Sequence, residues 1–419
     1  MLSPARASSG QHLVWVVPVL AEAAALGRSM ILAWVLGPGE LGQAMILALT
    51  VRLAEMASDV GVDRLMLQAG DGGTRRFQAE MHGVTIARGL IAALVLLAAA
   101  PILAAVFTGG PAPAAFAWLA AVPALRGLAH LDFRRSERLL RYKPMALVEG
   151  GATIAMAACV LPAAVLLADH RAMPAVLTVH AAVYAGLSHL VAVRPYQVRF
   201  KVSALRRVWH FGAPLVSNAM LLFFTFYADR VIVAKAYDWT TLAVYGVALQ
   251  LALLPAQITG RAAASAVLPR LRIAIRRNAL AKVWQPVLTL YIILAAVMSS
   301  GFAFLAPAVI GLLYGAGFQP DGALALALGA AAGFRILRTP YSQLAIAAGR
   351  TGDPARANLI RALALIPAAA VAAASFPLAA IAAAAALGEA GATWRAYVLS
   401  RPTFSSTGKQ EVYAWAPTR

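Results

Sequence analysis

The chain has 419 residues, of which 61% are hydrophobic and only 13% are charged, and its mean hydropathy is +0.74. A soluble protein is nearer half apolar and a quarter charged, so this composition excludes a soluble globular protein and indicates an integral membrane protein. The net charge of +19 is spread over short loops between apolar segments, which is typical of membrane topology signals and not of a nucleic-acid-binding surface. The single cysteine, Cys159, excludes an internal disulfide and a cysteine metal site.

Twelve segments are long and apolar enough to cross a bilayer as helices, which needs about twenty residues each. In chain order they are 12–36, 43–67, 84–107, 113–133, 144–168, 173–193, 210–236, 241–268, 285–306, 322–347, 358–376 and 378–398. The first could be mistaken for a signal peptide, because Arg6 precedes an apolar stretch that ends near Ala-Glu-Ala. Its apolar pattern continues through Arg28, however, and this favours a spanning helix. The last two segments are rich in alanine and are divided only by "SFP", where proline favours a break.

The connections between these segments alternate in charge. "LGPGELG", "TGGPAP" and "YGAGFQPDG" carry no lysine or arginine, whereas "RRSERLLRYK", "RPYQVRFKVSALRR", "RLRIAIRRNALAK" and "GRTGDPAR" are strongly basic. The positive-inside rule then places both termini and all basic loops in the cytoplasm. The loops on the other side are short, so the sequence leaves no room there for a soluble catalytic domain, and we expect no catalytic residues.

The longest basic connection, "RPYQVRFKVSALRR", divides the chain into two sets of six helices, and it is either a plain linker or an amphipathic segment in the headgroup region. The two halves are related in sequence pattern. "RSMILAWVLGPGELGQ" begins at Arg28 and "RVIVAKAYDWTTLAVYG" at Arg230, 202 positions later. Repeats of this kind are common in secondary transporters. We therefore predict an all-α polytopic membrane protein with about twelve transmembrane helices in two pseudo-symmetric six-helix lobes around a central cavity. The predicted lobes are residues 1–200 and 201–400, followed by a cytoplasmic tail, 401–419.

Two stretches carry a family resemblance. "ILAWVLGPGELGQAMILALTVRLAEMASDVGVDRLMLQ" and "FGAPLVSNAMLLFFTFYADRVIVAKAYDWTTLAVYGVALQL" resemble helices one and two, and seven and eight, of the polysaccharide transporters, the O-antigen (Wzx-type) flippases. This family lies in the multidrug/oligosaccharidyl-lipid/polysaccharide exporter superfamily. The resemblance covers most of residues 12–350. It implies alternating access by two lobes, and as cargo a polyprenyl-diphosphate-linked oligosaccharide moved to the outer leaflet of the bacterial inner membrane.

Arginines inside the predicted spans are candidates for contact with an anionic cargo. An arginine at mid-bilayer costs about 2.5–3.5 kcal/mol on insertion scales, so it faces a wet cavity or a partner. Arg28 lies eight residues before the outer end of its helix, and Arg230 is its repeat mate. Planar guanidinium groups bind phosphate oxygens bidentately, so the two arginines predict a diphosphate site. The alternative for Arg230 is an ion pair with Glu22 or, less favourably, with the adjacent Asp229.

The second predicted helix carries Arg52, Glu55, Asp59 and Asp63 at spacings of three, four and four residues, which places them on one helix face. Either Arg52 and Glu55 neutralise each other, or Arg52 contacts cargo while a carboxylate binds a coupling Na⁺ or H⁺. Arg261 lies 202 positions after Asp59, so the two residues form either a gate pair or an entry site for diphosphate. The resemblance to lipid II flippases, which use arginines in helices one, two and eight, suggests roles for Arg28, Arg52 and Arg261.

Arg126 in the fourth helix and Arg335 in the tenth correspond at an offset of 209. With Arg338 they lie in the cytoplasmic third, where long side chains snorkel, so they are cargo candidates with a structural alternative. His180, His189 and His210 are expected to be packing residues. The chain has no Gly-rich nucleotide loop, so we expect ion-gradient coupling, with Glu22, Glu55, Asp59 and Asp229 as coupling or gate candidates.

The sequence therefore predicts a flippase without cofactor, resident metal or catalytic residues. Its predicted partners are the lipid-linked oligosaccharide, membrane lipids and, from the family, a polysaccharide polymerase or export partner. A monomer can do this work. Two alternatives stay open at this point. A drug/cation antiporter of the same superfamily should have an acidic cavity with few arginines, and a membrane glycosyltransferase or ligase should carry acidic or histidine residues on long outer loops.

Overall fold

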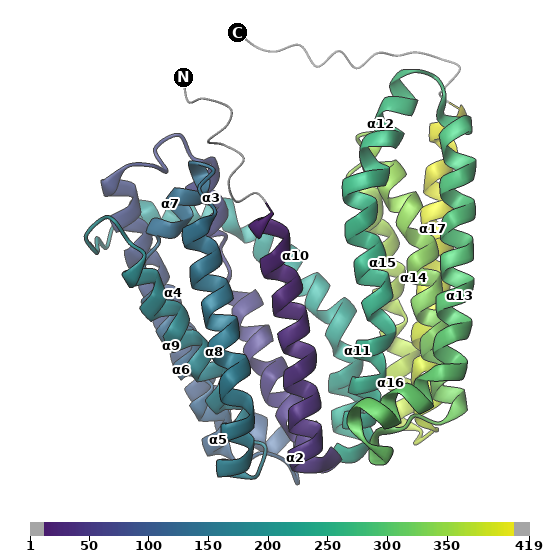
Figure 1. Cartoon of the computed structure of the whole chain (residues 1–419), viewed down its shortest axis with the longest axis horizontal. Coiled ribbons are helices and arrows are strands. Elements are labelled where there is room, and N and C mark those ends of the chain that lie inside the picture. The colour runs from purple at the N-terminus through teal and green to yellow at the C-terminus, as the bar shows by residue number, and fades with distance from the viewer. Residues whose placement is uncertain (1–11, 406–419) are drawn as a thin grey trace. The chain divides into compact units, whose positions relative to one another are not determined.

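The computed structural model describes residues 12–405, and within that range it contains helices and no strands (Figure 1). These residues form two compact units, one ending at Ala243 and the other beginning at Val244. The predicted lobe boundary at residue 200 concerns the sequence repeat and stays a prediction. Arg6, most of the tail 401–419 and both termini lie outside the described residues.

The first unit is a helical bundle around α2. Its helices are α2 (Leu13–Ser58), α3 (Val62–Gln68), α4 (Arg75–Val106), α5 (Pro113–Trp118), α6 (Ala121–Gly127), α7 (Asp132–Arg138), α8 (Lys143–Leu167), α9 (Ala172–Leu190) and α10 (Val202–Ala236). α2 packs against α4, α8, α9 and α10, and α4 packs against α5 and α6. The boundary between the two units falls within α11 (Trp239–Ala262).

The predicted first and second spans are joined where the sequence expects, but by a connection shorter than 37–42. Val17 and Arg52, near the two ends of α2, line one cavity, so the chain reverses direction between them. Helix runs on both sides of Gly37, whose φ of 76° and ψ of 177° make the only non-helical residue inside α2. Glycine adopts a positive φ without a steric penalty, and Pro38 directly after it has the fixed φ that suits the first turn of a helix. The "LGPGELG" turn is therefore a kink between two spans.

The second span ends earlier than the sequence predicts. α2 stops at Ser58, Asp59 Oδ1 accepts the Gly61 N–H at 3.1 Å, and Gly61 has φ 70°. An aspartate that bonds its own backbone two residues on offers the chain an alternative to the helix. Asp63 therefore lies on the separate helix α3, and the predicted single helix face from Arg52 to Asp63 is wrong in its continuity.

The predicted fourth span is broken. Its residues form α5, α6 and α7, and the last of these is bent by 55° from the preceding pair. The basic connection before the seventh span is also partly helical, because α10 begins at Val202 and leaves Val202, Leu205 and Trp209 exposed. This face is consistent with an amphipathic start to α10. Arg207 within it donates two hydrogen bonds to Asp71, at 2.7 and 2.8 Å, and these hold the pKa of the Asp71 carboxyl below its usual value.

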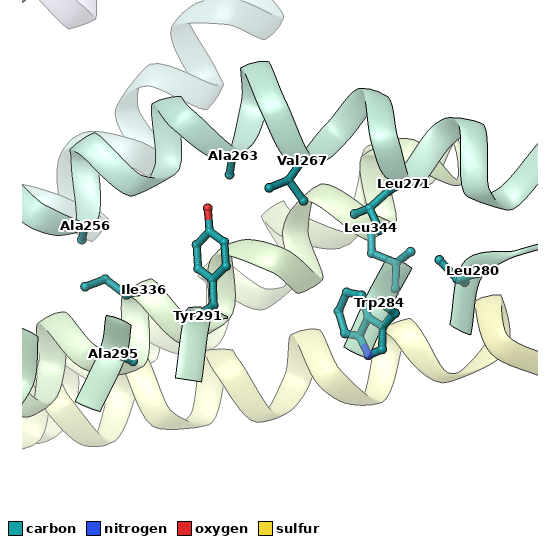
Figure 2. Packing of buried hydrophobic residues seen from close by; sticks show 10 residues of the cluster. All are labelled: Ala256, Ala263, Val267, Leu271, Leu280, Trp284, Tyr291, Ala295, Ile336 and Leu344. Atoms are coloured by element: carbon teal, nitrogen blue, oxygen red, sulfur yellow. The ribbon is translucent and has the colours of Figure 1, made fainter. Parts of the chain in front are cut away.

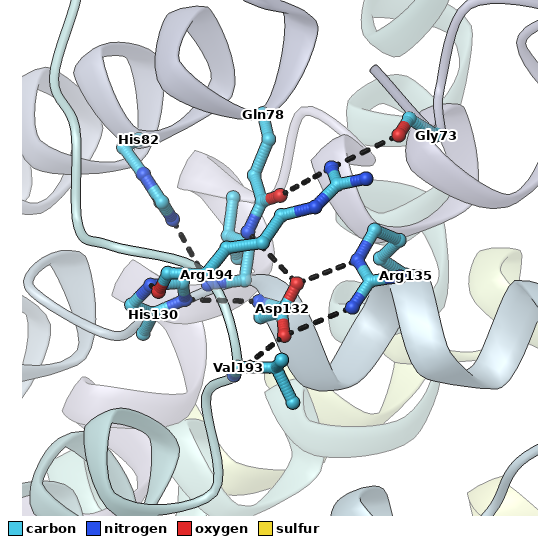
Figure 3. Close-up of polar contacts among 9 residues, drawn as sticks. Gly73, Gln78, His82, His130, Asp132, Arg135, Val193 and Arg194 are labelled. Carbon is cyan, nitrogen blue, oxygen red and sulfur yellow. Dashed lines mark hydrogen bonds and ion pairs between the residues drawn. The ribbon is translucent and has the colours of Figure 1, made fainter. Parts of the chain in front are cut away.

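A polar cluster fixes the segment that joins α9 to α10 (Figure 3). Asp132 accepts the side chain of Arg135 at 2.6 Å and the Val193 N–H at 2.9 Å, while Arg194 donates to Gly73 O at 2.9 Å. His82 Nε2 accepts the Leu131 N–H at 3.0 Å, so its Nδ1 carries the proton and donates to Gln197 O at 2.8 Å. His130 accepts the Asp132 N–H at 3.1 Å in the same way. Both imidazoles are therefore neutral in this arrangement.

The second unit is built around α14. Its elements after α11 are the π-helix η1 (Ala263–Val267), α12 (Leu268–Arg276), α13 (Leu280–Tyr314), the 3₁₀-helix η2 (Ala316–Phe318), α14 (Gly322–Ala347), α15 (Asp353–Leu363), α16 (Leu365–Ala373) and α17 (Leu378–Ser405). α14 packs against α12, α13 and α17. Figure 2 shows the core that α12, α13 and α14 share with α11 and η1, with the side chains of Trp284, Ile336 and Leu344. These three residues are buried, and Tyr291 in the same core donates to Thr259 O at 3.1 Å.

The break predicted at "SFP" is confirmed, because α16 ends at Ala373 and Ser375 has φ 57° before α17 begins. Nine helices within residues 12–405 are long and apolar enough to cross a membrane, or ten if the bent pair Pro113–Gly127 and Asp132–Arg138 is one span. The twelve predicted segments exceed the ten spans, counted with the bent pair, for two reasons. α2 contains two of them, and α17, interrupted by Glu389 and Arg395, is not among the nine.

The two halves share an irregularity at one repeat position. The second span breaks at Asp59–Gly61, and the eighth contains the π-helix Ala263–Val267. Residue 263 lies 202 positions after Gly61, the same offset that relates Arg28 to Arg230. A π-helix and a helix break both disturb the regular hydrogen-bond ladder, and π-helices occur often at functional sites.

Candidate functional site

The first unit encloses a polar cavity of about 560 Å³. Its walls come from α2, α3, α4, α6, α7, α8, α9 and α10. The charged and histidine side chains that line it are Arg52, Glu55, Asp59, Asp63, Arg64, Arg88, Arg126, Arg134, Glu149 and His180. The four members of the predicted stripe, from Arg52 to Asp63, therefore face one space even though the helix between them is broken.

Arg126 lies at the centre of this cavity. Its Nη1 pairs with Glu55 Oε1 at 2.8 Å, its Nη2 lies 3.5 Å from His180 Nδ1, and its guanidinium stacks over the Tyr184 ring at 5.3 Å. Arg126 is in the last turn of α6, where a cation interacts favourably with the partial negative charge at the helix end. About a third of its side chain is exposed, so the guanidinium is held in place and still accessible from the cavity.

Arg52 shares the carboxylate of Glu55 with Arg126. Its Nη1 is 4.0 Å from Glu55 Oε2, at the limit of an ion pair, and 54% of its side chain is exposed. The predicted alternative, in which Arg52 and Glu55 neutralise each other, fits this geometry poorly because Glu55 bonds Arg126 at the shorter distance. Two guanidinium groups therefore face the cavity around one carboxylate.

Arg28 is placed beside this group. It lies on α2, where its Nη1 donates to Met156 Sδ at 3.4 Å, and it is close enough to His180 to interact with it electrostatically. Its buried Nε has no hydrogen-bond partner, and none of the ion pairs among residues 12–405 involves it. Arg28, Arg52 and Arg126 together exceed the charge of Glu55 by two. We call Arg28, Arg52, Arg126, Glu55 and His180 the arginine cluster.

Most of the remaining charges of the cavity are balanced by acids. Arg88 lies 3.5 Å from Asp59 Oδ1. Arg134 is held by three carboxylates, at 3.1 Å from Asp63, 2.8 Å from Glu149 and 3.0 Å from Glu137. This part of the wall is therefore an ion-pair network. Of the other charges in the wall, Arg64 adds one positive charge, and Arg52 with Arg126 exceed the charge of Glu55 by one.

Arg28 itself does not line the cavity, and neither do the other predicted residues. Arg230 lies on α10 in the first unit, where its guanidinium donates to Phe226 O at 3.2 Å and stacks over Tyr227. The neighbouring Asp229 is buried and accepts the backbone N–H of Arg230 at 2.8 Å. Glu22 lies on α2, and Arg261 lies on α11 within the second unit. The gate pair of Arg261 with Asp59 stays a prediction.

Arg335 belongs to a second, buried group of charges. Glu389 of α17 is buried and receives Arg361 Nε at 2.7 Å, Arg338 Nη2 at 3.2 Å and Arg335 Nη1 at 4.0 Å. These contacts tie α14 and α15 to α17. Arg338 therefore does not snorkel to the surface, as the sequence suggests, because a buried carboxylate holds it inside the unit.

Sequence reasoning missed several residues of the site. Arg134 was assigned with its neighbours in "RRSERLLRYK" to a topology signal, and Glu149 and Arg88 were not considered. His180 was expected to pack, yet it lines the cavity beside Arg126. One signal was present in the sequence, because Glu149 lies inside an otherwise apolar span, and an acid in such a place needs a basic partner.

The arrangement can bind an anion. Guanidinium groups form charge-assisted, bidentate hydrogen bonds to phosphate oxygens. Among the described residues, no group of three or more histidine, cysteine, aspartate or glutamate side chains is arranged to hold a metal ion. The site thus offers positively charged donors for an anionic ligand.

Comparison with known proteins gives two results. A family model described as "Polysaccharide biosynthesis protein" matches residues 31–320, which is 290 of the 419 residues. No curated protein is similar enough in sequence to count as a relative.

Solved structures show the same fold. The chain is similar to the lipid II flippase MurJ in an inward closed conformation, with TM-score 0.70 and 12% identity over 95% of this chain and 90% of that one. It is also similar to an inward-facing multidrug resistance MATE family transporter of the MOP superfamily, with TM-score 0.60 and 14% identity over 93% and 96%. A third is the eukaryotic MATE transporter AtDTX14, with TM-score 0.56 and 14% identity over 94% and 98%. The prediction of an all-α, multi-pass membrane protein of this superfamily's fold is confirmed.

Proposed function

Because this chain belongs to the polysaccharide biosynthesis protein family, we propose that it is a flippase that moves a polyprenyl-diphosphate-linked oligosaccharide across the bacterial inner membrane. One observation carries the proposal. Arg52 and Arg126 face one cavity and share the single carboxylate of Glu55, with Arg28 beside them. This excess positive charge suits a diphosphate, whose four or so accessible oxygens can accept from several guanidinium groups.

The proposed mechanism uses these residues in turn. The diphosphate enters the cavity from the end where the basic loops lie, and Arg52 and Arg126 donate to its oxygens. Arg28, which lies deeper along α2, then holds the anion as the protein changes conformation. Transport by alternating access and the cytoplasmic location of both termini are part of this proposal.

Glu55 is the group through which an ion gradient could act. A proton on Glu55 removes the charge that competes with phosphate for Arg126 and Arg52. The cavity then binds an anion more tightly, so protonation of Glu55 and binding of the cargo favour each other. Ion coupling at Glu55 is proposed on this geometry, and the sequence has no nucleotide-binding loop.

The drug/cation antiporter is disfavoured by the same cavity. Its acids are engaged by Arg88 and Arg134, so they do not offer an open site for a cation. A membrane glycosyltransferase is disfavoured at the opposite end of the bundle, where Glu40 is held by the side chain and the backbone N–H of His170, both at 2.8 Å.

The test is surface polysaccharide production in a strain that lacks this gene. Wild type should restore export, whereas Arg52→Ala, Arg126→Ala and Arg28→Ala should not, and the lipid-linked intermediate should accumulate. Arg171→Ala is the matched control, because Arg171 is exposed and pairs only with Asp169 in the short connection between α8 and α9. Membrane levels of every variant are measured in parallel. Normal polysaccharide in the deletion strain, with no second flippase present, would overturn the proposal.

A further inference from the structure

A second cavity in the first unit is apolar. It has a volume of about 370 Å³ and lies between the end of α2, the middle of α4 and the start of α10. Eleven of its thirteen lining residues are apolar, and the two exceptions are Ser58 and Arg88. We call this space the apolar groove. Its volume is within the range of small-molecule binding sites, and it offers too few polar groups to hold ordered water.

The residues that line the groove leave room for a hydrocarbon chain. Its lining includes the small residues Ala54, Ala57 and Ala87, which take up little of the space. Ile91 and Trp209 stand at its rim and are about 60% exposed, so the groove opens on the surface of the unit and is not sealed inside it. An apolar concavity of this kind on a membrane-spanning bundle is accessible to lipid chains.

The apolar groove lies next to the polar cavity. Ser58 and Arg88 line both spaces, so the groove and the cavity adjoin each other at these two residues. Arg88 reaches from α4 toward Asp59 Oδ1 at 3.5 Å, and 28% of its side chain is exposed. The junction thus presents one guanidinium and one hydroxyl, and both can donate to a phosphate oxygen.

A ligand that fills both spaces must be anionic at one end and hydrocarbon at the other. We propose that the apolar groove holds the first isoprene units of the cargo's polyprenyl chain, while the diphosphate lies in the polar cavity with Arg88 at the junction. This inference rests on the proposed function, since it names where the tail of that cargo lies. The inference assigns the entry path of the polyprenyl chain to the space between α4 and α10.

The rival occupant is an acyl chain of the surrounding bilayer. Such a lipid would use the groove without using the arginine cluster. The cargo chain, in contrast, is tied to the diphosphate, so its position in the groove depends on the arginines. This dependence separates the two occupants in one experiment.

The experiment is photo-crosslinking of the purified full chain in phospholipid nanodiscs. The probe is a polyprenyl diphosphate with a diazirine on its second isoprene unit, and labelled peptides are mapped. A diacyl phosphatidylglycerol with a diazirine near its headgroup is the second probe. We expect the diphosphate probe to label residues 84–95 and 205–209, and unlabelled polyprenyl diphosphate to compete.

Two variants supply the matched comparison. Ala57→Phe fills the groove, whereas Ala157→Phe places the same ring on an exposed alanine of α8 that lines neither space. Overpacking of a site lowers occupancy strongly, so we expect groove labelling to fall at least about fivefold in Ala57→Phe and to stay unchanged in Ala157→Phe.

Three other results would overturn the inference. Labelling of the groove by the phospholipid probe, undiminished by excess polyprenyl diphosphate, would make it a bilayer-lipid site. Diphosphate labelling that maps elsewhere, but that Arg126→Gln still abolishes, would remove the groove and leave the proposed function standing. If the diphosphate probe labels no site specifically, and unlabelled polyprenyl diphosphate does not reduce its labelling, both the inference and the proposed function fail.

Discussion

Replacing Arg126 by glutamine separates cargo binding from structural pairing. In the structure its guanidinium is 2.8 Å from Glu55, and both side chains are about a quarter to a third exposed. A pair of this kind lies between a surface pair, worth about 0–1 kcal/mol, and a buried one, whose disruption costs about 3–5 kcal/mol. We therefore expect Arg126→Gln to lower the stability of the protein by about 1–2 kcal/mol.

The effect on ligand binding should be larger than this structural cost and of a different kind. Losing one charge-assisted contact to phosphate is worth about 2 kcal/mol, or roughly thirtyfold in Kd. Farnesyl diphosphate is a suitable soluble probe, and its Kd is measured by calorimetry on the purified protein. Glu55→Gln removes the carboxylate that competes with phosphate, so it should bind the probe at least as tightly as wild type.

The single variant Glu55→Gln decides between the two roles, and the double variant Glu55→Gln/Arg126→Gln checks that the two changes act on the same contact. If Arg126 binds the diphosphate, the double variant stays as weak as Arg126→Gln. If Arg126 acts only by holding Glu55, then Glu55→Gln weakens binding as much as Arg126→Gln, and the double variant is no worse than either. Thermal midpoints of all three variants serve as the control for folding. That second pattern would refute the assignment of Arg126 to cargo.

Three further predictions concern the fold. Gly212→Ala should destabilise the first unit by about 1–3 kcal/mol, seen as a lower thermal midpoint, because a Cβ at Gly212 meets backbone of the α2–α3 junction. Asp71→Asn should lower the free energy of unfolding by less than about 1 kcal/mol at neutral pH, because the ion pair of Asp71 with Arg207 is half exposed. The pKa of Asp71 is lowered on folding, so this difference in stability should vanish as the pH falls through that lowered pKa. Tyr291→Phe should cost about 1 kcal/mol in the second unit, measured by thermal unfolding.

Each of these has a comparison within the chain. A Cβ at Gly186 meets no atom within 4 Å, so Gly186→Ala should leave the midpoint unchanged or raise it. An Asp71→Asn difference that grows on acidification would contradict the sign of the linkage. An unchanged midpoint in Tyr291→Phe would show that Thr259 O finds another donor.

The fold followed from the sequence wherever a span is long and uniformly apolar. The predicted span 322–347 coincides with α14, and 144–168 with α8, because hydropathy and length alone decide such helices. The positions where helices break could not be predicted in this way. Gly37, Asp59 and Gly61 depend on single backbone conformations and local hydrogen bonds, which a twenty-residue window averages away.

The site was predicted in part for a similar reason. Intramembrane arginines are few and visible, so Arg28, Arg52 and Arg126 could be named from the sequence. Their partners could not, because Glu55 pairs with a residue 71 positions away and Arg134 with acids from three helices. Spacing along one helix suggested Arg52 as the partner of Glu55, but the three-dimensional packing of α6 against α9 and α2 supplies Arg126 instead.

The kink at Gly37 has a practical consequence for mapping this protein in a cell. Membrane topology is commonly charted by inserting epitope tags or protease sites into the turns between spans. At Gly37 the turn consists of a single residue between two helices, and Pro38 begins the second helix. A tag inserted there would separate the two helices. A missing reporter signal would then reflect a misfolded protein and not the topology of the native one. Gly315, whose Cβ position is surrounded by open space, is the better place for such a reporter.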